Sequence, residues 1–249
     1  MAKPYLSVVI PAYNEASNFR NGVLDEPLEY LQKQKYSWEL IFVDDGSTDD
    51  THKMLKSLCS LNDRVNLINI PHGGKAAAVT TGILSAKGDY ILFTDFDQST
   101  PLHQVEKFLN AHKNGADVVI GIRTQTQKDT LVRKIRSWAF VALVQIVAIP
   151  NIKDSQCGFK SFTCAAAQKI FKNFKVCLPK KVVIGGYMGA FDVEALFLAR
   201  KFGLEVAQVE VSWIKYLSDR LNIWKEPLQM ALDTVKIRIY DILGKYDQI

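Results

Sequence analysis

The chain contains the stretch Tyr90-Ile91-Leu92-Phe93-Thr94-Asp95-Phe96-Asp97, an apolar run that ends in two carboxylates. A buried strand that continues in this way places an anionic cluster at its carboxyl end, where open α/β sheets form their ligand crevices. Such a pair suits Mg²⁺ or Mn²⁺, which bind one or two carboxylates and keep positions for water and a phosphate. Solvated turns and helix caps show the same pattern, so the pair gains its meaning from the motifs around it.

Short β-branched runs alternate with helix-length amphipathic segments through the first half of the chain. The five runs are Leu6–Ile10, Leu40–Val43, Val65–Ile68, Tyr90–Phe93 and Val118–Ile120. Their alternation with helices predicts βαβ units, and therefore an α/β fold with a mostly parallel central sheet covered on both faces. The second half is less regular. There we expect a basic and then apolar segment over 130–149, a loop over 151–160, a helix over 192–201, a strand over 205–211 and an amphipathic stretch over 224–243.

Length and composition narrow the class of protein. The 249 residues suffice for a substantial core, and 48% apolar with 23% charged residues is typical of a globular protein. A net charge of +5 does not by itself indicate nucleic acid, although the basic cluster at 128–136 favours an anionic partner. The four cysteines lack zinc-site spacing, which favours reduced thiols. The N-terminus leads directly into a strand-like run, and the most apolar stretch, 138–149, is too short to span a bilayer, so we expect a cytoplasmic protein.

Polar motifs follow the first two predicted strands. Pro11-Ala12-Tyr13-Asn14-Glu15 comes after the first strand and Asp44-Asp45-Gly46-Ser47 after the second. Because neighbouring parallel strands end together, Tyr13 is placed to stack on a nucleobase while Asp45 accepts a hydrogen bond from the N–H edge of that base. The alternative is that both motifs are turns, with Asp45-Gly46 forming a tight bend and Asp44 capping a helix.

A glycine-containing loop, His72-Gly73-Gly74-Lys75, opens the next helix-like run. Two glycines let the backbone approach a phosphate, the helix that follows offers N–H groups, and Lys75 supplies positive charge. A plain turn with a solvated lysine is an equally good interpretation of this loop alone. A base-binding pair, a phosphate loop and a metal pair thus follow three separate strands in order. Independent turns would seldom line up in this way.

Together these motifs resemble a known enzyme family. Val8-Val9-Ile10-Pro11-Ala12-Tyr13-Asn14-Glu15, Val43-Asp44-Asp45-Gly46-Ser47, Gly74-Lys75 and Asp95-Phe96-Asp97 are similar to the signature of family 2 glycosyltransferases, which have the Rossmann-like glycosyltransferase A fold. In the second half, the segments 154–160, 190–194, 211–213 and 218–221 resemble those of polyprenyl-phosphate sugar transferases, and the dolichyl-phosphate β-glucosyltransferases more than the mannosyl enzymes. The resemblance runs from about Leu6 to Leu243. It implies a single domain over 1–249, with a nucleotide-sugar half over about 1–123 and an acceptor half over about 124–249.

The resemblance assigns the donor side of the site residue by residue. Pro11, Tyr13 and Glu15 would hold the nucleoside, and Asp45 the base. Gly74 and Lys75 would meet the diphosphate, Asp95 would contact ribose or metal, Asp97 would bind the metal, and Arg123 would lie near the donor. The mannosyl relatives carry a Gln two residues after the second metal-site Asp, whereas here Gln98 comes one residue earlier and Ser99 holds that position. A third metal ligand is therefore not defined by the motif.

On the acceptor side, the resemblance places Arg133 or Arg136 at the acceptor phosphate, and Lys160, Asp192 and Arg220 around the reaction centre. It implies an inverting transfer of a hexose, glucose above others, from a UDP-sugar to polyprenyl or dolichyl phosphate. Asp192 would act as a base if the acceptor were an alcohol, or would simply cap the helix that follows. The alternatives are GDP-mannose as donor, a soluble or polysaccharide acceptor, and an inactive nucleotide-sugar-binding module.

A lipid acceptor requires contact with a membrane surface. The segment 133–143 joins Arg133, Lys134 and Arg136 to Trp138 and Phe140, as interfacial helices do, so we expect a peripheral protein on the cytoplasmic membrane face. A core helix with a basic cap is the alternative. The C-terminal amphipathic stretch is a second candidate for membrane contact, or a face for oligomers. The loop over 172–189 is either a lid or a passive surface loop.

Overall fold

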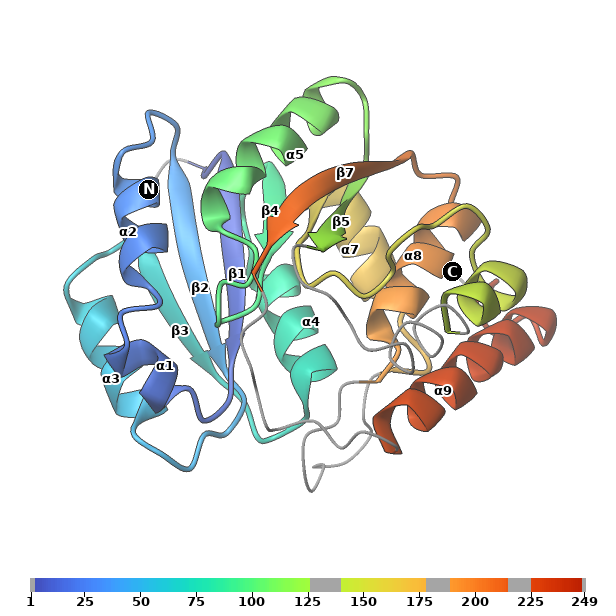
Figure 1. The fold of residues 1–249 in the computed structure, drawn as a ribbon, viewed down its shortest axis with the longest axis horizontal. Coiled ribbons are helices and arrows are strands. Elements are labelled where there is room, and N and C mark those ends of the chain that lie inside the picture. The colour runs from blue at the N-terminus through green and yellow to red at the C-terminus, as the bar shows by residue number, and fades with distance from the viewer. Residues whose placement is uncertain (1–2, 126–139, 178–188, 215–224, 248–249) are drawn as a thin grey trace.

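A computed structural model describes residues 3–125, 140–177, 189–214 and 225–247 of the protein. Its centre is one seven-stranded sheet with the order β3-β2-β1-β4-β6-β5-β7 (Figure 1). The strands are β1 Leu6–Ala12, β2 Trp38–Asp44, β3 Val65–Asn69, β4 Tyr90–Phe93, β5 Val118–Gln125, β6 Lys160–Thr163 and β7 Val206–Trp213. The helices are α1 Ala16–Arg20, α2 Asp25–Gln32, α3 Thr51–Ser60, α4 Lys75–Ser85, η1 Leu102–Gln104, α5 Val105–Lys113, α7 Cys164–Phe171, α8 Phe191–Lys201 and α9 Lys225–Ile242.

The sheet is parallel except around β6. Strands β3, β2, β1 and β4 pair in parallel, as do β5 and β7, whereas β6 runs antiparallel to β4 and β5. The predicted α/β fold with a mostly parallel sheet is confirmed, and all five predicted strands are present. The sequence order reverses between β1 and β4, and open α/β sheets bind their ligands at such a point. The functional site is therefore expected where these two strands end.

Helices cover both faces of the sheet because side chains alternate along each strand. In β1, Val9 joins the buried cluster that contains α4, α7 and α8, while Val8 and Ile10 join the cluster that contains α2 and α5. This layering turns the strand ends into a platform between two helical layers. The predicted helix over 192–201 and strand over 205–211 are confirmed as α8 and β7, and the C-terminal amphipathic stretch forms α9.

Two local expectations differ from the structure. Strand β6 begins at Lys160, where the sequence predicted only the end of a loop. Asp44 does not cap a helix: its Oδ1 accepts the N–H of Ser47 at 3.0 Å, which closes a turn, and α3 begins after Asp50. A carboxylate at the end of a strand satisfies the nearest backbone N–H, and here that donor lies in the loop and not in α3.

Helix α4 packs closely on the sheet because one of its residues has no side chain. A Cβ atom at Gly82 would lie 2.3 Å from Cγ1 of Val9 and 2.9 Å from Cγ2 of Val43, on the two strands whose ends form the platform. Gly82 therefore sets the distance between α4 and strands β1 and β2. Since α4 begins with Lys75, the same contact fixes where that lysine enters the site.

Among the described residues, no helix is both long and apolar enough to span a membrane. This statement does not cover the segment 126–139, where most of the predicted interfacial sequence lies.

Replacing Gly82 with alanine should destabilise the protein, although alanine is the better helix former by about 1 kcal/mol. The overpacked methyl group should lower the free energy of unfolding by about 1–3 kcal/mol. Urea unfolding followed by circular dichroism measures this, with the exposed Ser85→Ala in the same helix as a control that should change little. A Gly82→Ala protein more stable than wild type would contradict the close packing.

Candidate active site

Asp45 fixes the loop that leads into α4. Its carboxylate is buried and accepts the N–H groups of Gly73 at 2.7 Å and Gly74 at 2.9 Å, while the Nδ1 of His72 lies 2.8 Å away. Gly74 precedes α4 and has a φ of 83°, which a residue with a side chain rarely adopts. The N–H groups of both glycines therefore bind Asp45, and the N–H groups predicted for a phosphate are those of the helix that follows.

An aromatic pair lies beside this loop. The ring of Tyr13 stacks on the ring of His72, with 4.2 Å between the centroids and 14° between the planes. Glu15 follows in the same segment, where its N–H donates to Oγ1 of Thr51 at 2.7 Å. The predicted base-binding residues Tyr13 and Asp45 are thus joined through His72, which the sequence motifs did not single out.

The end of β4 carries the predicted metal pair. Asp95 forms an ion pair with Lys75 at the start of α4, so the lysine is mostly buried and is not the solvated turn residue of the alternative interpretation. Asp97 accepts the N–H of Ser99 at 2.9 Å. The next residue, Gln98, has a φ of 51°. Its side-chain amide donates from Nε2 to the backbone carbonyl of Asp95 at 2.8 Å.

Burial and neighbouring charge shift the acidity of this group. Burial raises the pKa of Asp97, and the nearby Asp95 carboxylate raises it further. Burial lowers the pKa of Lys75, but the Asp95 and Asp192 carboxylates outweigh it and hold that pKa above its usual value. The lysine therefore stays charged, and the Asp95 and Asp97 carboxylates crowd one another beside it.

The donor atoms at Asp95 and Asp97 fit a divalent cation in part. Two crowded carboxylates are the ligand type that Mg²⁺ and Mn²⁺ prefer, and a cation would relieve their repulsion. Within the described ranges the Oε1 of Gln98 is buried without a hydrogen-bond partner, so one more oxygen is present. No group of three His, Cys, Asp or Glu side chains among the described residues is arranged to hold a metal. The remaining positions would belong to water and phosphate.

A loop from Asp154 to Phe159 brings the second half of the chain against the metal pair. A Cβ atom on Gly158 would lie 2.0 Å from an Asp95 carboxylate oxygen, so only glycine fits there while Asp95 keeps its place. Asp154 binds Arg123 through two hydrogen bonds, 2.7 Å from Nε and 2.9 Å from Nη2. Burial raises the pKa of Asp154, but the Arg123 guanidinium outweighs it and the net shift is downward.

Lys160 and Asp192 form a buried ion pair on the same side. The Nζ of Lys160 donates to Oδ1 of Asp192 at 2.6 Å and to the carbonyl of Cys157 at 2.5 Å, and Lys160 is 0% exposed. Asp192 lies in the first turn of α8 but makes no capping hydrogen bond, so the helix-cap alternative is wrong. Burial raises the pKa of Asp192 despite the lowering effects of Lys160 and Lys75.

Two residues further along α8, Glu194 holds the start of that helix in place. Its buried carboxylate accepts the backbone N–H groups of Lys175, Val176 and Cys177 and the hydroxyl of Tyr246. Four hydrogen bonds fill a carboxylate. Glu194 thus has a structural role, because it anchors the helix that carries Asp192.

The structure brings together most of the predicted site residues. Lys75, Asp95, Asp97, Lys160 and Asp192 form one charged cluster, with Tyr13 and Asp45 on the other side of the glycine loop. Arg133, Arg136 and Arg220 lie outside the described residues, as do 178–188 of the predicted loop. His72, Asp154 and Gly158 are the contributors that the motifs did not single out, since their partners lie far away in sequence.

A mostly parallel sheet with a reversal at β1 and β4, and with acidic residues and a lysine at that edge, agrees with the resemblance to glycosyltransferases of the A fold. The model of the Glycosyl transferase family 2 matches residues 7–174. The chain belongs to that family.

Named relatives lie within the same family. The chain is 34% identical to "Dolichyl-phosphate beta-glucosyltransferase" of Dictyostelium discoideum, over 96% of this chain and 76% of that protein. The proteins of the same name from Homo sapiens and Saccharomyces cerevisiae are 32% and 33% identical, each over 97% of this chain and over 77% and 76% of their own lengths.

Solved structures share the fold. Mannosyl-3-phosphoglycerate synthase from Rubrobacter xylanophilus has a TM-score of 0.69 at 17% identity, covering 99% of this chain and 77% of that one. Glucosyl-3-phosphoglycerate synthase from Mycobacterium tuberculosis, in complex with Mn²⁺, UDP and its product, has a TM-score of 0.64 at 18% identity, covering 94% and 80%. These likenesses confirm the glycosyltransferase A fold.

Replacing Asp154 with asparagine should lower the free energy of unfolding by about 2 kcal/mol at neutral pH, because Arg123 loses a charged partner. The pKa of Asp154 is lowered in the folded state, so the stability it contributes is present above the unfolded pKa of about 3.9 and is lost as pH falls through the folded pKa. The difference between wild type and variant should therefore be constant at pH 5–7 and shrink below about pH 4. Chemical unfolding over a pH series measures it, with the exposed Asp63→Asn as control. A difference independent of pH would contradict this role.

Proposed function

We propose that the protein transfers glucose from UDP-glucose to dolichyl or another polyprenyl phosphate, with inversion at the anomeric carbon, at the cytoplasmic membrane face. The observation that carries this proposal is the charged cluster of Lys75, Asp95, Asp97 and Asp192 at the β1–β4 reversal. Its support is the similarity to dolichyl-phosphate beta-glucosyltransferases over nearly the whole chain.

The donor would lie across the ends of β1, β2 and β4. Tyr13 and His72 offer a stacked aromatic surface for a nucleobase, and Asp45 stands beside them. A carboxylate accepts about four hydrogen bonds, and among the described residues His72, Gly73 and Gly74 account for three at Asp45, so the N3–H of uracil would supply a fourth. Pro11 and Glu15 would border the nucleoside. Uracil and guanine both present N–H donors that Asp45 could accept, so the choice of UDP rests on the similarity to the glucosyltransferases.

The reaction depends on how the donor sugar and the acceptor phosphate are positioned more than on proton transfer. An acceptor phosphate is anionic near neutral pH, with a second pKa of about 6, so its oxygen can attack the anomeric carbon without a base. The new bond joins that oxygen to C1 while the bond from C1 to the UDP oxygen breaks, which inverts the configuration. Lys75 would meet the developing charge on the diphosphate. A cation held by Asp95 and Asp97, when bound, would supply further neutralisation of that charge.

Lys160 and Asp192 would border the position of the sugar on the side away from the nucleotide. Their pair is buried before substrate arrives, so its position costs no reorganisation during the reaction. The raised pKa of Asp192 also suits a general base, which favours an alcohol acceptor as the second candidate function. Arg123, Arg133, Arg136 and Arg220 are the cations proposed to hold donor and acceptor phosphates.

A panel of donors and acceptors tests the proposal. Purified protein with Mg²⁺ or Mn²⁺ should release UDP fastest from UDP-glucose with a short-chain polyprenyl phosphate, and GDP-mannose should support little turnover. The corresponding polyprenol without phosphate should be inactive, because it lacks the anionic nucleophile. Preference for GDP-mannose, or for the alcohol, would replace the proposal with the corresponding alternative. Nucleotide-sugar binding without any turnover would indicate an inactive module.

Removing the carboxylate of Asp97 should reduce turnover by at least about 10²-fold, as the loss of a major electrostatic contributor typically does. Asp97→Ala is compared with Asp63→Ala, which removes an exposed carboxylate away from the site and should leave turnover unchanged. Chelator should reproduce the loss in wild type, and Mn²⁺ should restore activity to wild type only. Full activity of Asp97→Ala, or of wild type in chelator, would show that the pair holds no metal needed for transfer.

A further inference from the structure

The outer face of α9 carries an apolar stripe that nothing in the described chain covers. Leu228, Leu232, Val235, Ile239 and Ile242 follow one another at intervals of four and three residues and are 40–72% exposed. That spacing puts all five on one side of the helix. The opposite side, with Met230, Asp233 and Ile237, is buried against the protein. Helix α9 lies at the outer edge of the molecule (Figure 1).

Two cations border this stripe, and each is paired with an acid of the same helix, Lys236 with Asp233 at 3.5 Å and Arg238 with Asp241 at 2.6 Å. Lys236 and Arg238 lie on opposite edges, because residues two apart on a helix are separated by about 200°. Both side chains are about half exposed, at 53% and 51%, whereas Asp233 and Asp241 are only 2% and 17% exposed. The exposed part of α9 therefore combines apolar side chains with positive charge. That is the composition of helices that lie in the surface of an anionic membrane.

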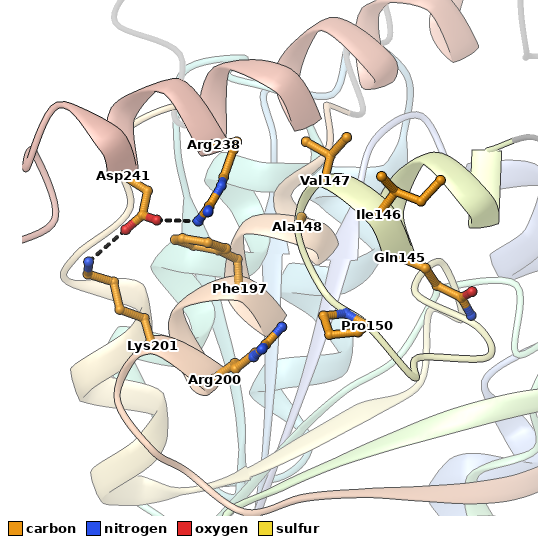
Figure 2. A pocket seen from close by; sticks show the side chains of 10 residues that line it. All are labelled: Gln145, Ile146, Val147, Ala148, Pro150, Phe197, Arg200, Lys201, Arg238 and Asp241. Carbon is orange, nitrogen blue, oxygen red and sulfur yellow. Dashed lines mark hydrogen bonds and ion pairs between the residues drawn. The ribbon is translucent and has the colours of Figure 1, made fainter.

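A pocket of about 470 Å³ adjoins the Arg238 edge. Figure 2 shows Arg238 from α9 and Arg200 from the end of α8 extending toward it, with Ile146 and Val147 on its far side. Ile146 is 84% exposed, so the pocket rim is apolar as well. Asp241 also lines the pocket and pairs with Arg238 and Lys201, so Arg200 and the exposed half of Arg238 are the groups that would meet a lipid phosphate above its acyl chains.

A second copy of this chain fits the stripe less well. The spacing of the five apolar residues would allow two α9 helices to pair. Each edge of the stripe carries one half-exposed cation, however, so a symmetric pair of helices would bring Lys236 or Arg238 of one copy toward a cation of the other in either orientation. An anionic bilayer surface meets the same charges with attraction.

The stripe is also connected to the active site. Met230, on the buried side of α9, receives a contact of 3.3 Å between its Sδ and the Nε2 of Gln156. Gln156 belongs to the loop that carries Asp154 and Gly158, and its N–H donates to Asp154. The helix that would meet the membrane thus contacts the loop that packs on Asp95.

We propose that the outer face of α9, with the arginine-lined pocket beside it, is the surface by which the protein docks on an anionic bilayer. The proposal adds a membrane-binding surface to the proposed function. It rests on that function only for the reason why the protein would bind a membrane, which is to reach a lipid acceptor. It takes up the second candidate of the sequence, the C-terminal amphipathic stretch, and not the segment 133–143, which lies mostly outside the described residues.

Vesicle co-sedimentation tests the proposal with three variants of the full chain. Leu232→Ser/Ile239→Ser removes two members of the stripe, and Lys236→Ser/Arg238→Ser removes its charged edges. Leu61→Ser is the matched control, because Leu61 is 83% exposed but follows α3 at the opposite end of the molecule (Figure 1). Vesicles are phosphatidylcholine alone or with phosphatidylserine, each at low and high salt. Circular dichroism and thermal melting confirm that each variant folds.

Wild type and Leu61→Ser should bind the anionic vesicles alike and lose affinity at high salt. The stripe variant should bind at least about tenfold more weakly, and the charge variant should lose most of its preference for anionic over neutral vesicles. Equal binding by wild type and the stripe variant, or no binding by wild type, would overturn the proposal. A dimer of wild type in sedimentation velocity that the stripe variant loses, without vesicle binding, would instead assign the stripe to a second copy.

Turnover with a water-soluble short-chain polyprenyl phosphate separates this result from the proposed function. The stripe variant should keep wild-type turnover there, since none of its residues touches the charged cluster. If wild type binds vesicles as expected but turns over no donor, the docking surface stands and the proposed reaction fails.

Discussion

The ion pair between Lys160 and Asp192 is the contact on which the site depends. Both side chains are removed from water, which costs several kcal/mol for each charge unless a close partner and further hydrogen bonds compensate. The compensation comes from the carbonyl of Cys157 and from the ring of Phe93, 5.4 Å from Nζ. β6, α8, the loop before β6 and the end of β4 must therefore meet at one point, and that point adjoins Asp95.

The remaining charges are arranged around this pair as a nearly balanced set. Lys75 pairs with Asp95, and the Asp192 carboxylate also raises the pKa of this lysine. Asp97 lies close to Asp95, so an excess of negative charge remains at the end of β4. A cation or a strongly polarised sugar ring relieves that excess, whereas a second anion at the carboxylates is repelled. Phosphates would then be confined to the positions near Lys75 and the arginines.

Much of the fold could be predicted from the sequence, because five strands contain short, largely apolar runs separated by helix-length segments. β6 was missed since it begins with Lys160, a residue that a strand buries only when a distant carboxylate pairs with it. The motif positions located Lys75, Asp95 and Asp192, but the contacts of Asp154, Gly158 and His72 join residues 27 or more positions apart. Asp44 shows the same limit on a smaller scale, since which backbone N–H a carboxylate reaches depends on how the loop closes.

Helix α8 joins the reaction centre to the proposed docking surface. Asp192 lies in its first turn and Arg200 near its last, a separation of about 12 Å along the axis at 1.5 Å per residue. Glu194 and Tyr246 fix this helix to the C-terminal end of the chain, beyond α9. Two rigid helices therefore set the height of Asp192 above any surface that α9 contacts. A lipid phosphate reaches only a short way out of a bilayer, so an enzyme that uses it needs such a fixed height.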